Sequence, residues 1–332
     1  VKKIRSSILL LGSLSARCDR FMLYHPGGCV IGSRPVGTHF DALRKLGVSI
    51  RVEGKTYIID ARHRRSAAFA LQEFSVTATE NAMMLAAALP GTTVIKIAAS
   101  EPHVEDLGYF LRKLGATIDG LGTHTLTIRG RRRLSGTTHT LIPDPIEAAT
   151  FLVLGAVTKS PITVTGVRPD HLDIVLEKLA AFGVGTKVSG RSIAVRPSSR
   201  LRAVAKIDTR PYPGIPTDTQ SLLGVLASQA EGETLIFDTI FEGRFNYLSE
   251  LEKMGADVSV LNPHQALVRG ATSLHGTVIK SYDLRAGAAL IIAALCAKGK
   301  TVIEDIYQVD RGYERIEERL QKVGASMRRI TL

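Results

Sequence analysis

A glycine-rich loop near the start of the chain combines a thiol with a cationic side chain. Residues 26–35 read Pro-Gly-Gly-Cys-Val-Ile-Gly-Ser-Arg-Pro, so three glycines surround Cys29 and Arg34 follows. Backbone N–H groups of such a loop can approach an anion closely, and the start of the helix expected after Arg34 attracts negative charge. A thiol beside cations has a lowered pKa and can donate or accept a proton. A plain turn with a structural cysteine is the alternative for the loop alone.

Acidic residues occur where two apolar helices are expected to begin. Asp218 follows Pro216 and Thr217 at the front of one helix. Asp283 and Arg285 lie two residues apart at the front of another. Both places depart from the local pattern of the surrounding repeat, so both are candidate sites. For Asp218 the competing interpretation is a helix cap, worth about 1 kcal/mol.

Three arginines occupy similar places in different repeats of the chain. Arg34, Arg244 and Arg311 lie 13, 11 and 13 residues before the glycine that ends the next expected helix. A lone arginine is usually a solvated surface residue, but the recurrence predicts that these side chains converge on one anionic ligand. Arginine suits a carboxylate or a phosphate because its planar guanidinium binds two oxygens at once.

The elements that must position these residues form a repeat. A helix-ending phrase of leucine, a hydrophobic residue and glycine recurs with glycine separations of 68, 68, 72 and 69 residues, at Gly47, Gly115, Gly183, Gly255 and Gly324. Each glycine stands where a helix C-cap favours positive φ. A second phrase opens a strand after an apolar helix with the same period, at residues 91–95, 160–164, 232–236 and 299–303. One unit therefore reads helix, strand, helix, strand, strand over about 70 residues, longer than the common solenoid repeats.

The repeats fall into two expected domains. Pro143 and Pro145 fix φ and interrupt regular pairing, so we place the boundary between residues 142 and 143. Residues 1–142 carry the glycine-rich loop, and residues 143–332 carry Asp218, Arg285 and Arg311. The first unit lacks its leading helix, which predicts a further segment upstream. The longest apolar stretch, residues 286–297, is predicted to be a buried helix.

Composition narrows the classes of partner. Forty-three Lys and Arg against 31 Asp and Glu give a net charge of +12, which favours anionic partners. The basic residues are scattered apart from clusters at 62–65 and 131–133 in expected turns. Because there is no Trp, aromatic residues are only 5% and no nucleic-acid-binding motif accompanies the clusters, small anionic ligands are favoured over nucleic acid.

Other classes find no support in the sequence. No run of about 18 uncharged apolar residues exists to span a membrane. Three cysteines without paired spacing, Cys18, Cys29 and Cys296, indicate neither a disulfide framework nor a zinc site and fit a reducing cytoplasm. The nine histidines form no ligand set, and the glycine-rich loop matches neither the ATP nor the dinucleotide fingerprint. We therefore expect no metal and no cofactor.

The ordered motifs resemble the UDP-N-acetylglucosamine 1-carboxyvinyltransferases, a family of enolpyruvyl transferases, over essentially all 332 residues. The resemblance implies a two-domain inside-out α/β barrel built from repeated βαβαββ units, with the first unit truncated and the active site between the domains. The segments that carry it are residues 5–12, 26–29, 32–36, 216–218, 241–245, 283–285 and 310–315.

The resemblance also implies an activity. It is the transfer of the enolpyruvyl group of phosphoenolpyruvate to the 3′-hydroxyl of UDP-N-acetylglucosamine, with release of phosphate, in cytoplasmic peptidoglycan precursor synthesis. Cys29 would help to protonate the methylene carbon and be alkylated by fosfomycin, and Asp218 is the candidate general base. Arg34 and Arg311 would bind on the phosphate side of phosphoenolpyruvate, and Arg285 would bind its carboxylate.

Further positions follow from the same resemblance. Residues matched to the nucleotide sugar are Arg5, Arg34, Pro35, Ser75, Val76, Asp218 and Ile240. Other residues expected to line the site are Arg244, Asp283 and Asp144. The oligomeric state is left open by the sequence.

The chain departs from the family pattern at several places. A Lys-Asn pair near the family's N-terminus has no counterpart here. Gly37 replaces an Asp, Thr77 a Gly, Gly243 an Asn and Ser100 an Arg. The expected catalytic residues survive while the nucleotide side is altered. Two alternatives therefore stay open: a paralogue with another acceptor, such as the shikimate-pathway relative that the Gly-Gly-Cys loop disfavours, and a catalytically silent protein that binds nucleotide sugars.

Overall fold

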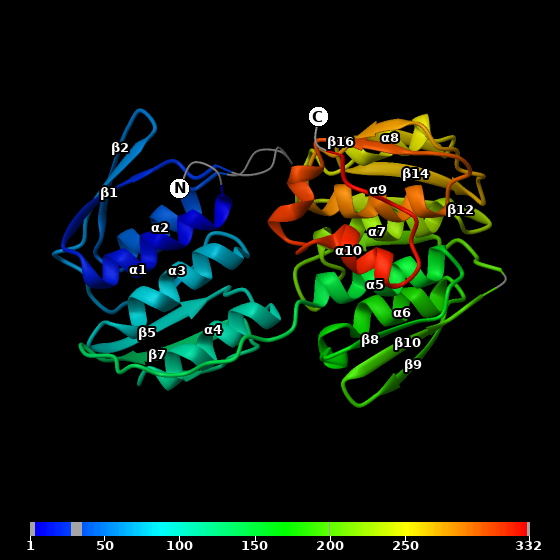
Figure 1. Ribbon diagram of the computed structural model, residues 1–332. Coiled ribbons are helices and arrows are strands. Elements are labelled where there is room, and N and C mark those ends of the chain that lie inside the picture. The colour runs from blue at the N-terminus through cyan, green and yellow to red at the C-terminus, as the bar shows by residue number, and fades with distance from the viewer. Residues whose placement is uncertain (1–3, 28–34, 199, 331–332) are drawn as a thin grey trace. The chain divides into compact units, whose positions relative to one another are not determined.

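The computed structural model describes residues 4–27, 35–198 and 200–330 (Figure 1). The chain folds into two compact units, each with its own hydrophobic core. Among the described residues, unit 1 comprises residues 4–27, 35–142 and 211–213, and unit 2 comprises residues 143–198, 200–210 and 214–330. The sequence assigned every residue after 142 to the second domain, whereas residues 211–213 belong to unit 1. The Oγ of buried Ser100 donates to the backbone oxygen of Tyr212 at 3.3 Å, which ties this short segment to unit 1.

Unit 1 combines one helical layer with two sheets. Its helices are η1 (Arg5–Leu9), α1 (Leu10–Arg17), α2 (Gly37–Lys45), α3 (Val76–Ala87) and α4 (Pro102–Lys113). One sheet is antiparallel with the order β1-β3-β2, formed by Arg20–Tyr24, Thr56–Asp60 and Ser49–Glu53. The other has the order β4-β5-β7-β6, formed by Ala68–Ala70, Gly91–Lys96, Thr125–Gly130 and Thr117–Asp119. In that sheet only β4 and β5 pair in parallel.

Unit 2 has three sheets among its described residues. Its helices are α5 (Pro145–Val157), η2 (Pro169–His171), α6 (Asp173–Ala181), α7 (Thr217–Ser228), α8 (Asn246–Lys253), α9 (Leu284–Cys296), η3 (Ile306–Arg311) and α10 (Ile316–Lys322). The first sheet, β8-β10-β9, comes from Ile162–Thr165, Ser192–Arg196 and Gly185–Ser189. The second, β11-β12-β14-β13, comes from Lys206–Thr209, Gly232–Asp238, Gln265–Gly270 and Asp257–Asn262. The third pairs β15 (Val278–Lys280) with β16 (Val302–Glu304) in parallel.

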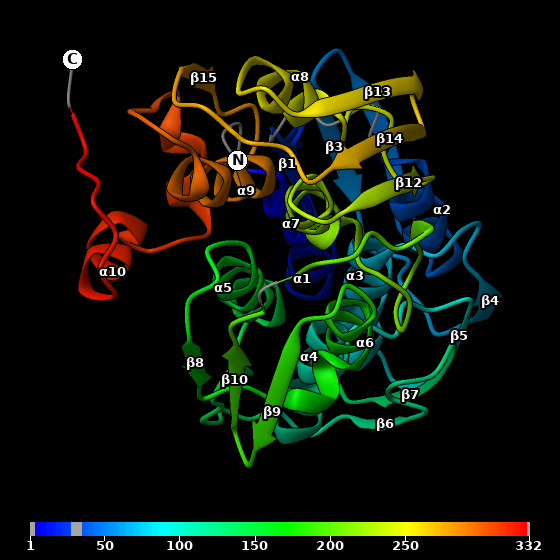
Figure 2. The same ribbon diagram turned by 90° about the vertical axis from the view of Figure 1, so that its right-hand side faces the viewer.

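Three helices of unit 2, α5, α7 and α9, lie inside its sheets. Figure 2 shows α5, α7 and α9 side by side, with the strands arranged around them. Each of these helices is buried over most of its length: residues 148–150 and 152–157 of α5, 219–228 of α7 and 286–293 of α9. A helix that is buried on nearly all sides belongs to the core of a domain. The predicted buried helix over 286–297 is confirmed, because α9 spans Leu284–Cys296 and buries residues 286–293. The inside-out arrangement is therefore present within this unit.

The predicted repeat is confirmed at its strands and its glycines. The order βαβαββ is complete from β4 to β7 in unit 1 and from β11 to β14 in unit 2. The five helix-ending glycines all have positive φ, between 82° and 114°, at Gly47, Gly115, Gly183, Gly255 and Gly324. Only glycine adopts this conformation without steric cost, so these positions end their helices where the sequence predicted.

The two basic clusters of the sequence have a structural role in the repeat. After each hairpin the chain returns to the C-terminal end of the helix that precedes that hairpin. In unit 1, the N–H of Arg65 donates to the carbonyl of Leu46 at 2.8 Å, and that of Ser135 donates to Leu114 at 2.9 Å. In unit 2, Arg202 and His275 make the equivalent bonds to Phe182 and Met254. Residues 62–65 and 131–133 lie in these return segments, and cations near a helix C-terminus are favoured by its dipole.

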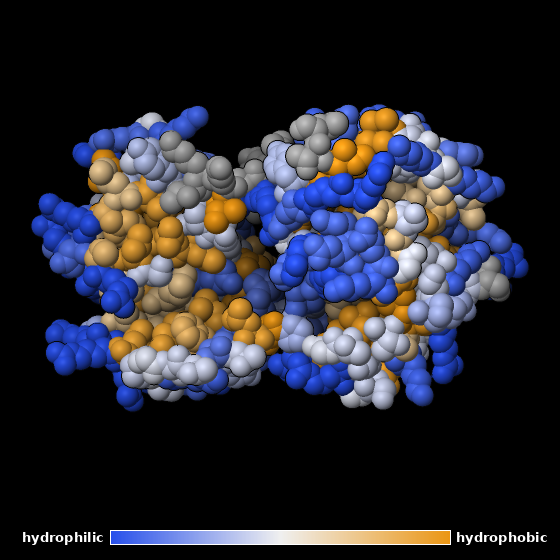
Figure 3. Space-filling view, viewed as in Figure 1, coloured by the Kyte–Doolittle hydropathy of each residue, from blue (hydrophilic) through white to orange (hydrophobic). Residues whose placement is uncertain are grey.

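A hydrophobic surface lies on the helical layer of unit 1. Among the described residues this unit has two sheets where unit 2 has three. Ile4 and Leu10 are exposed by 48% and 38%, and Figure 3 shows apolar residues gathered over α1. Gly12 of this helix lies against the backbone of Asn81, and its N–H donates to Asn81 Oδ1 at 2.6 Å, so only glycine allows α1 to approach α3 this closely.

Among the described residues no helix combines the length and apolar character needed to cross a bilayer.

Candidate active site

Three acidic residues stand at the N-terminal ends of the central helices of unit 2. Asp144 caps α5, and its Oδ1 accepts from the N–H groups of Ile146 and Glu147 at 2.8 and 3.2 Å. Asp283 caps α9 and accepts from the N–H groups of Arg285 and Ala286. Because α5, α7 and α9 pack against one another, their N-terminal acids belong to one region of the unit.

Asp218 does not cap its helix. The N-cap of α7 is Pro216, and no side chain accepts its first N–H groups. The carboxylate of Asp218 instead accepts a short hydrogen bond from Nη2 of Arg244 and a second from Nε of Arg285 at 3.2 Å. The alternative interpretation of Asp218 as a helix cap is therefore wrong, and its carboxylate binds two guanidinium groups instead.

The charges of this cluster stabilise one another. The protein packed around Asp218 disfavours its charged form, but the attraction of Arg244 and Arg285 outweighs that effect and holds the pKa of Asp218 below its usual value. Burial disfavours the charge of Arg285 as well, and Asp218, Tyr313 and Asp144 more than compensate, so the pKa of Arg285 is raised. Asp218 is consequently ionised and Arg285 protonated at neutral pH.

Arg244 is a buried cation with an incomplete set of partners. Its side chain is 7% exposed, and its Nη1 lies 3.8 Å from Oδ1 of Asp283. The guanidinium carbon lies 5.1 Å from the ring centroid of Phe241, a cation–π contact. Its Nε has no hydrogen-bond partner among the described atoms. A buried guanidinium is stable only beside anions, which explains its place between Asp218 and Asp283.

The loop that carries Arg244 is anchored at the end of β12. Buried Asp238 accepts from Oγ1 of Thr217 at 2.6 Å and from the N–H of Ile240 at 2.9 Å. One carboxylate therefore ties the start of α7 to the loop after β12. Ile240, a predicted nucleotide-sugar residue, is 38% exposed at this point.

Arg311 ends η3, a short helix that packs against α9. Its Nη1 donates to Oε1 of Gln308 at 3.3 Å. The neighbouring Asp310 accepts two hydrogen bonds from Arg329, of 2.6 and 2.7 Å, which fix the chain next to Arg311. A direct role of Arg311 beside the Asp218 cluster stays a prediction.

The remaining predicted residues lie earlier in the chain, before residue 143. Cys29 and Arg34 lie outside the described residues. Pro35 is exposed immediately before α2, and Arg5 begins η1. Ser75 caps α3, its Oγ accepting from the N–H of Ala78, and Val76 is the first residue of that helix.

His39 and Thr77 form a pair that sequence reasoning did not identify as a unit. Nε2 of His39, on α2, lies 2.8 Å from Oγ1 of Thr77, in the first turn of α3. His39 is 4% exposed, and burial together with the charge of Arg5 lowers its pKa to about 4. The imidazole is therefore neutral at physiological pH. The sequence marks Thr77 only as a departure from the family pattern, and no motif marks His39.

The other departures differ in their surroundings. A Cβ at Gly37, the first residue of α2, would meet nothing within 4 Å, so this position opens to free space. Ser100 is buried and bonds the segment around Tyr212, as described above.

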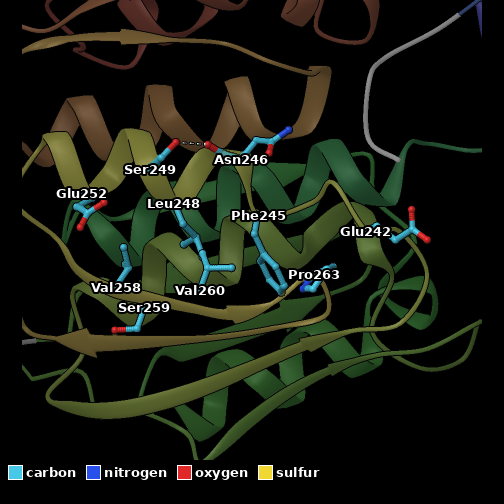
Figure 4. A pocket seen from close by; sticks show the side chains of 10 residues that line it. All are labelled: Glu242, Phe245, Asn246, Leu248, Ser249, Glu252, Val258, Ser259, Val260 and Pro263. Atoms are coloured by element: carbon cyan, nitrogen blue, oxygen red, sulfur yellow. Dashed lines mark hydrogen bonds between the residues drawn. The ribbon is translucent and has the colours of Figure 1, made fainter. Parts of the chain in front are cut away.

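A hollow on unit 2 is distinct in character from the arginine cluster (Figure 4). It lies between α8 and β13, and Phe245, Leu248 and Val260 point into it. Its other lining residues are Glu242, Asn246, Ser249, Glu252, Val258, Ser259 and Pro263. Two carboxylates and no cation make this hollow unsuited to an anion. Within the described ranges no group of three or more His, Cys, Asp and Glu residues is arranged to hold a metal ion.

Known proteins resemble the chain over its length. The model of the EPSP synthase (3-phosphoshikimate 1-carboxyvinyltransferase) family matches residues 1–320. A protein of Magnetococcus marinus named UDP-N-acetylglucosamine 1-carboxyvinyltransferase is 42% identical over 330 residues. The match covers 99% of this chain and 78% of the length of that protein. A protein of the same name from Coxiella burnetii is 43% identical over 332 residues, and the match covers 100% of this chain and 76% of that protein.

Solved structures share the fold. The enolpyruvyl transferase NikO from Streptomyces tendae superposes with a TM-score of 0.87 at 28% identity, covering 97% of this chain and 76% of that protein. An EPSP synthase from Acinetobacter baumannii superposes with a TM-score of 0.72 at 21% identity, covering 98% and 78%, and indicates the fold alone.

Proposed function

We propose that this chain, which belongs to the enolpyruvyl transferase family, transfers the enolpyruvyl group of phosphoenolpyruvate to the 3′-hydroxyl of UDP-N-acetylglucosamine and releases phosphate. The names of relatives that are 42% and 43% identical support carboxyvinyl transfer to UDP-N-acetylglucosamine. The observation that carries the proposal is the carboxylate of Asp218 held between Arg244 and Arg285 at the start of α7. This arrangement joins a proton acceptor to cations suited to a small polyanion.

The reaction proceeds by addition and elimination. In the addition, the 3′-oxygen of the sugar attacks C2 of phosphoenolpyruvate, Asp218 accepts the hydroxyl proton, and Cys29 helps to deliver a proton to the methylene carbon C3. The product is a tetrahedral ketal. In the elimination, the bond from C2 to the phosphate oxygen breaks, C3 loses a proton, and the carbon–carbon double bond forms again. Arg34 and Arg311 bind the phosphate side.

The cluster offers a way to make Asp218 a better base when substrate binds. In the free protein the two guanidinium groups hold the pKa of Asp218 low, which makes it a weak proton acceptor. When the carboxylate of phosphoenolpyruvate binds Arg285, part of that positive charge is compensated. The attraction on Asp218 then weakens and its pKa rises. Binding of one substrate thereby prepares the base for the hydroxyl of the other.

The nucleotide sugar is assigned to residues of unit 1 together with Asp218 and Ile240. The N-terminus of α3 presents Ser75 and Val76, and a helix N-terminus favours phosphate oxygens. Arg5, Arg34 and Pro35 complete the proposed binding set. Asp283 pairs with Arg244 as described above, and Oδ2 of Asp144 lies 4.0 Å from Nη2 of Arg285. The assignment places the chain in cytoplasmic peptidoglycan precursor synthesis.

The test is phosphate release with both substrates. Purified protein is incubated with phosphoenolpyruvate and UDP-N-acetylglucosamine, with each substrate omitted in turn, and the enolpyruvyl sugar is identified by mass spectrometry. Product that requires both substrates is the expected result. Alkylation of Cys29 by fosfomycin in the presence of UDP-N-acetylglucosamine is read in parallel, since a catalytically silent binding protein has no need of a reactive thiol. Absence of both product and alkylation would refute the proposal.

A second acceptor is favoured by one observation. Thr77 fills the first turn of α3 and bonds to His39, next to the positions assigned to the nucleotide sugar. A relative with a different acceptor would show turnover of phosphoenolpyruvate with another hydroxyl compound. Parallel assays with shikimate 3-phosphate and with other nucleotide sugars separate this case, because they report the same phosphate release.

A further inference from the structure

The guanidinium of Arg285 is held from three sides. Its Nε donates to Oδ2 of Asp218 at 3.2 Å, its Nη1 donates to Oη of Tyr313 at 3.3 Å, and its Nη2 lies 4.0 Å from Oδ2 of Asp144. The partners come from α7, from the turn after η3 and from the cap of α5. Asp218 is shared with Arg244, and Asp144 also accepts from helix N–H groups. Tyr313 is the uncharged partner of the three, and its hydroxyl contacts Nη1.

The direction of the hydrogen bonds behind Tyr313 is fixed by chemistry. An arginine can only donate, so Oη of Tyr313 accepts from Arg285 and uses its own proton toward Oγ1 of Thr150, 2.7 Å away. Thr150 in turn donates to the backbone carbonyl of Ile146 at 2.8 Å, and a carbonyl can only accept. The result is one directed chain from Arg285 through Tyr313 and Thr150 to the first turn of α5.

This chain is buried. Tyr313 is 0% exposed and Thr150 is 3% exposed. The guanidinium carbon of Arg285 also lies 5.6 Å from the ring centroid of Tyr313. The ring packs in the core, where a phenylalanine would fill the same space. The hydroxyl adds a lone pair aimed at Arg285, and a buried hydroxyl that loses its partner is costly.

We propose that Tyr313 and Thr150 are positioning residues that hold the guanidinium of Arg285 in the orientation that receives the carboxylate of phosphoenolpyruvate. This inference rests on the proposed function, which assigns that carboxylate to Arg285. Thr150 orients the hydroxyl of Tyr313, and Tyr313 orients Nη1. The guanidinium of Arg285 then presents its remaining N–H groups to the substrate in one orientation, so its side chain does not need to change rotamer on binding.

The test uses isosteric variants and a conservative control. Tyr313→Phe and Thr150→Val each break the chain with little change of volume, and Thr150→Ser keeps the hydroxyl. We expect the first two to raise KM for phosphoenolpyruvate about 10-fold, as loss of a bond to a charged group does. The expected change in kcat and in KM for UDP-N-acetylglucosamine is less than about threefold. Thr150→Ser should lie within about twofold of the wild type, and Tyr313→Phe combined with Thr150→Val should be no worse than Tyr313→Phe alone.

Several outcomes would overturn the inference. One is an unchanged KM for phosphoenolpyruvate in both isosteric variants while the wild type is active. Another is an equal change for both substrates, which indicates a general structural role, as would failure of both isosteric variants to fold. If the wild type shows neither turnover nor fosfomycin alkylation, the proposed function fails separately. The inference is then read from the rise in thermal midpoint that phosphoenolpyruvate causes, which must be smaller in Tyr313→Phe than in wild type. A wild type that phosphoenolpyruvate does not stabilise overturns the inference as well.

Discussion

Unit 1 buries two titratable side chains whose pKa values shift in opposite directions. Glu80 of α3 is 8% exposed, and burial together with the charge of Glu101 raises its pKa from 4.5 to about 7. His39 of α2 is 4% exposed, and burial together with the charge of Arg5 lowers its pKa from 6.5 to about 4. Each shift makes the stability of the fold depend on pH.

The two dependences have opposite signs. Between pH 4.5 and 7 the folded chain keeps a proton on Glu80 that the unfolded chain has lost, so its contribution is present at low pH and is lost as pH rises. Between pH 6.5 and 4 the unfolded chain binds a proton on His39 that the fold excludes, so stability is lost as pH falls. At 1.36 kcal/mol per pKa unit, each effect amounts to about 3 kcal/mol. Between pH 4.5 and 6.5, rising pH removes the stability contributed by Glu80 and restores the stability lost at His39, so the two effects oppose each other.

Single substitutions separate the slopes. Glu80→Gln removes the acid and keeps its shape, so the variant should match the wild type near pH 4.5 and exceed it by about 3 kcal/mol at pH 8. His39→Gln keeps an amide nitrogen near Thr77 and should gain about 3 kcal/mol over the wild type at pH 4, with little difference above pH 6.5. Glu101→Gln should move the Glu80 midpoint to lower pH, because it removes the like charge.

The assay is urea unfolding followed by circular dichroism at half-unit steps from pH 4 to 8. The quantity compared is the difference in unfolding free energy between variant and wild type, which cancels contributions from other groups. A difference between Glu80→Gln and wild type that does not change with pH would refute the reasoning. So would a difference of the opposite sign.

Three further predictions concern activity and are read from phosphate release. Asp218→Asn keeps an oxygen for Arg244 but removes the proton acceptor, so kcat should fall at least about 100-fold, and a loss under tenfold would contradict its role as base. Thr77→Gly removes the hydroxyl bonded to His39 and opens the first turn of α3. KM for UDP-N-acetylglucosamine should therefore fall several-fold while KM for phosphoenolpyruvate stays constant. An unchanged or higher KM for UDP-N-acetylglucosamine would count against a role of Thr77 in acceptor choice. Cys29→Ala should abolish turnover and fosfomycin labelling with an unchanged thermal midpoint, and an unfolded variant would mean that the cysteine is structural.

The sequence predicted the features that are local or periodic. The helix-ending glycines at 47, 115, 183, 255 and 324 could be located because a left-handed helix cap selects glycine wherever it occurs. The strands that open near residues 91, 162, 232 and 302 followed from the same period. Family resemblance then assigned residues to roles, because ordered motifs over 332 residues are specific. All of these role assignments stay predictions, and Cys29 and Arg34 also lie outside the described residues.

The sequence by itself thus determined the repeat, the apolar helices and the acids and arginines at their ends, since each depends on neighbours within a few turns. It could not tell that Asp144 and Asp283 cap their helices while Asp218 binds Arg244 and Arg285. Those partners lie 26 and 67 residues from Asp218, and Thr150 lies 163 residues from Tyr313. Only the tertiary structure brings such residues within hydrogen-bond distance: α5, α7 and α9 pack together, and the loop after β12 and the turn after η3 place Arg244 and Tyr313 beside their ends. No spacing along the chain encodes that packing.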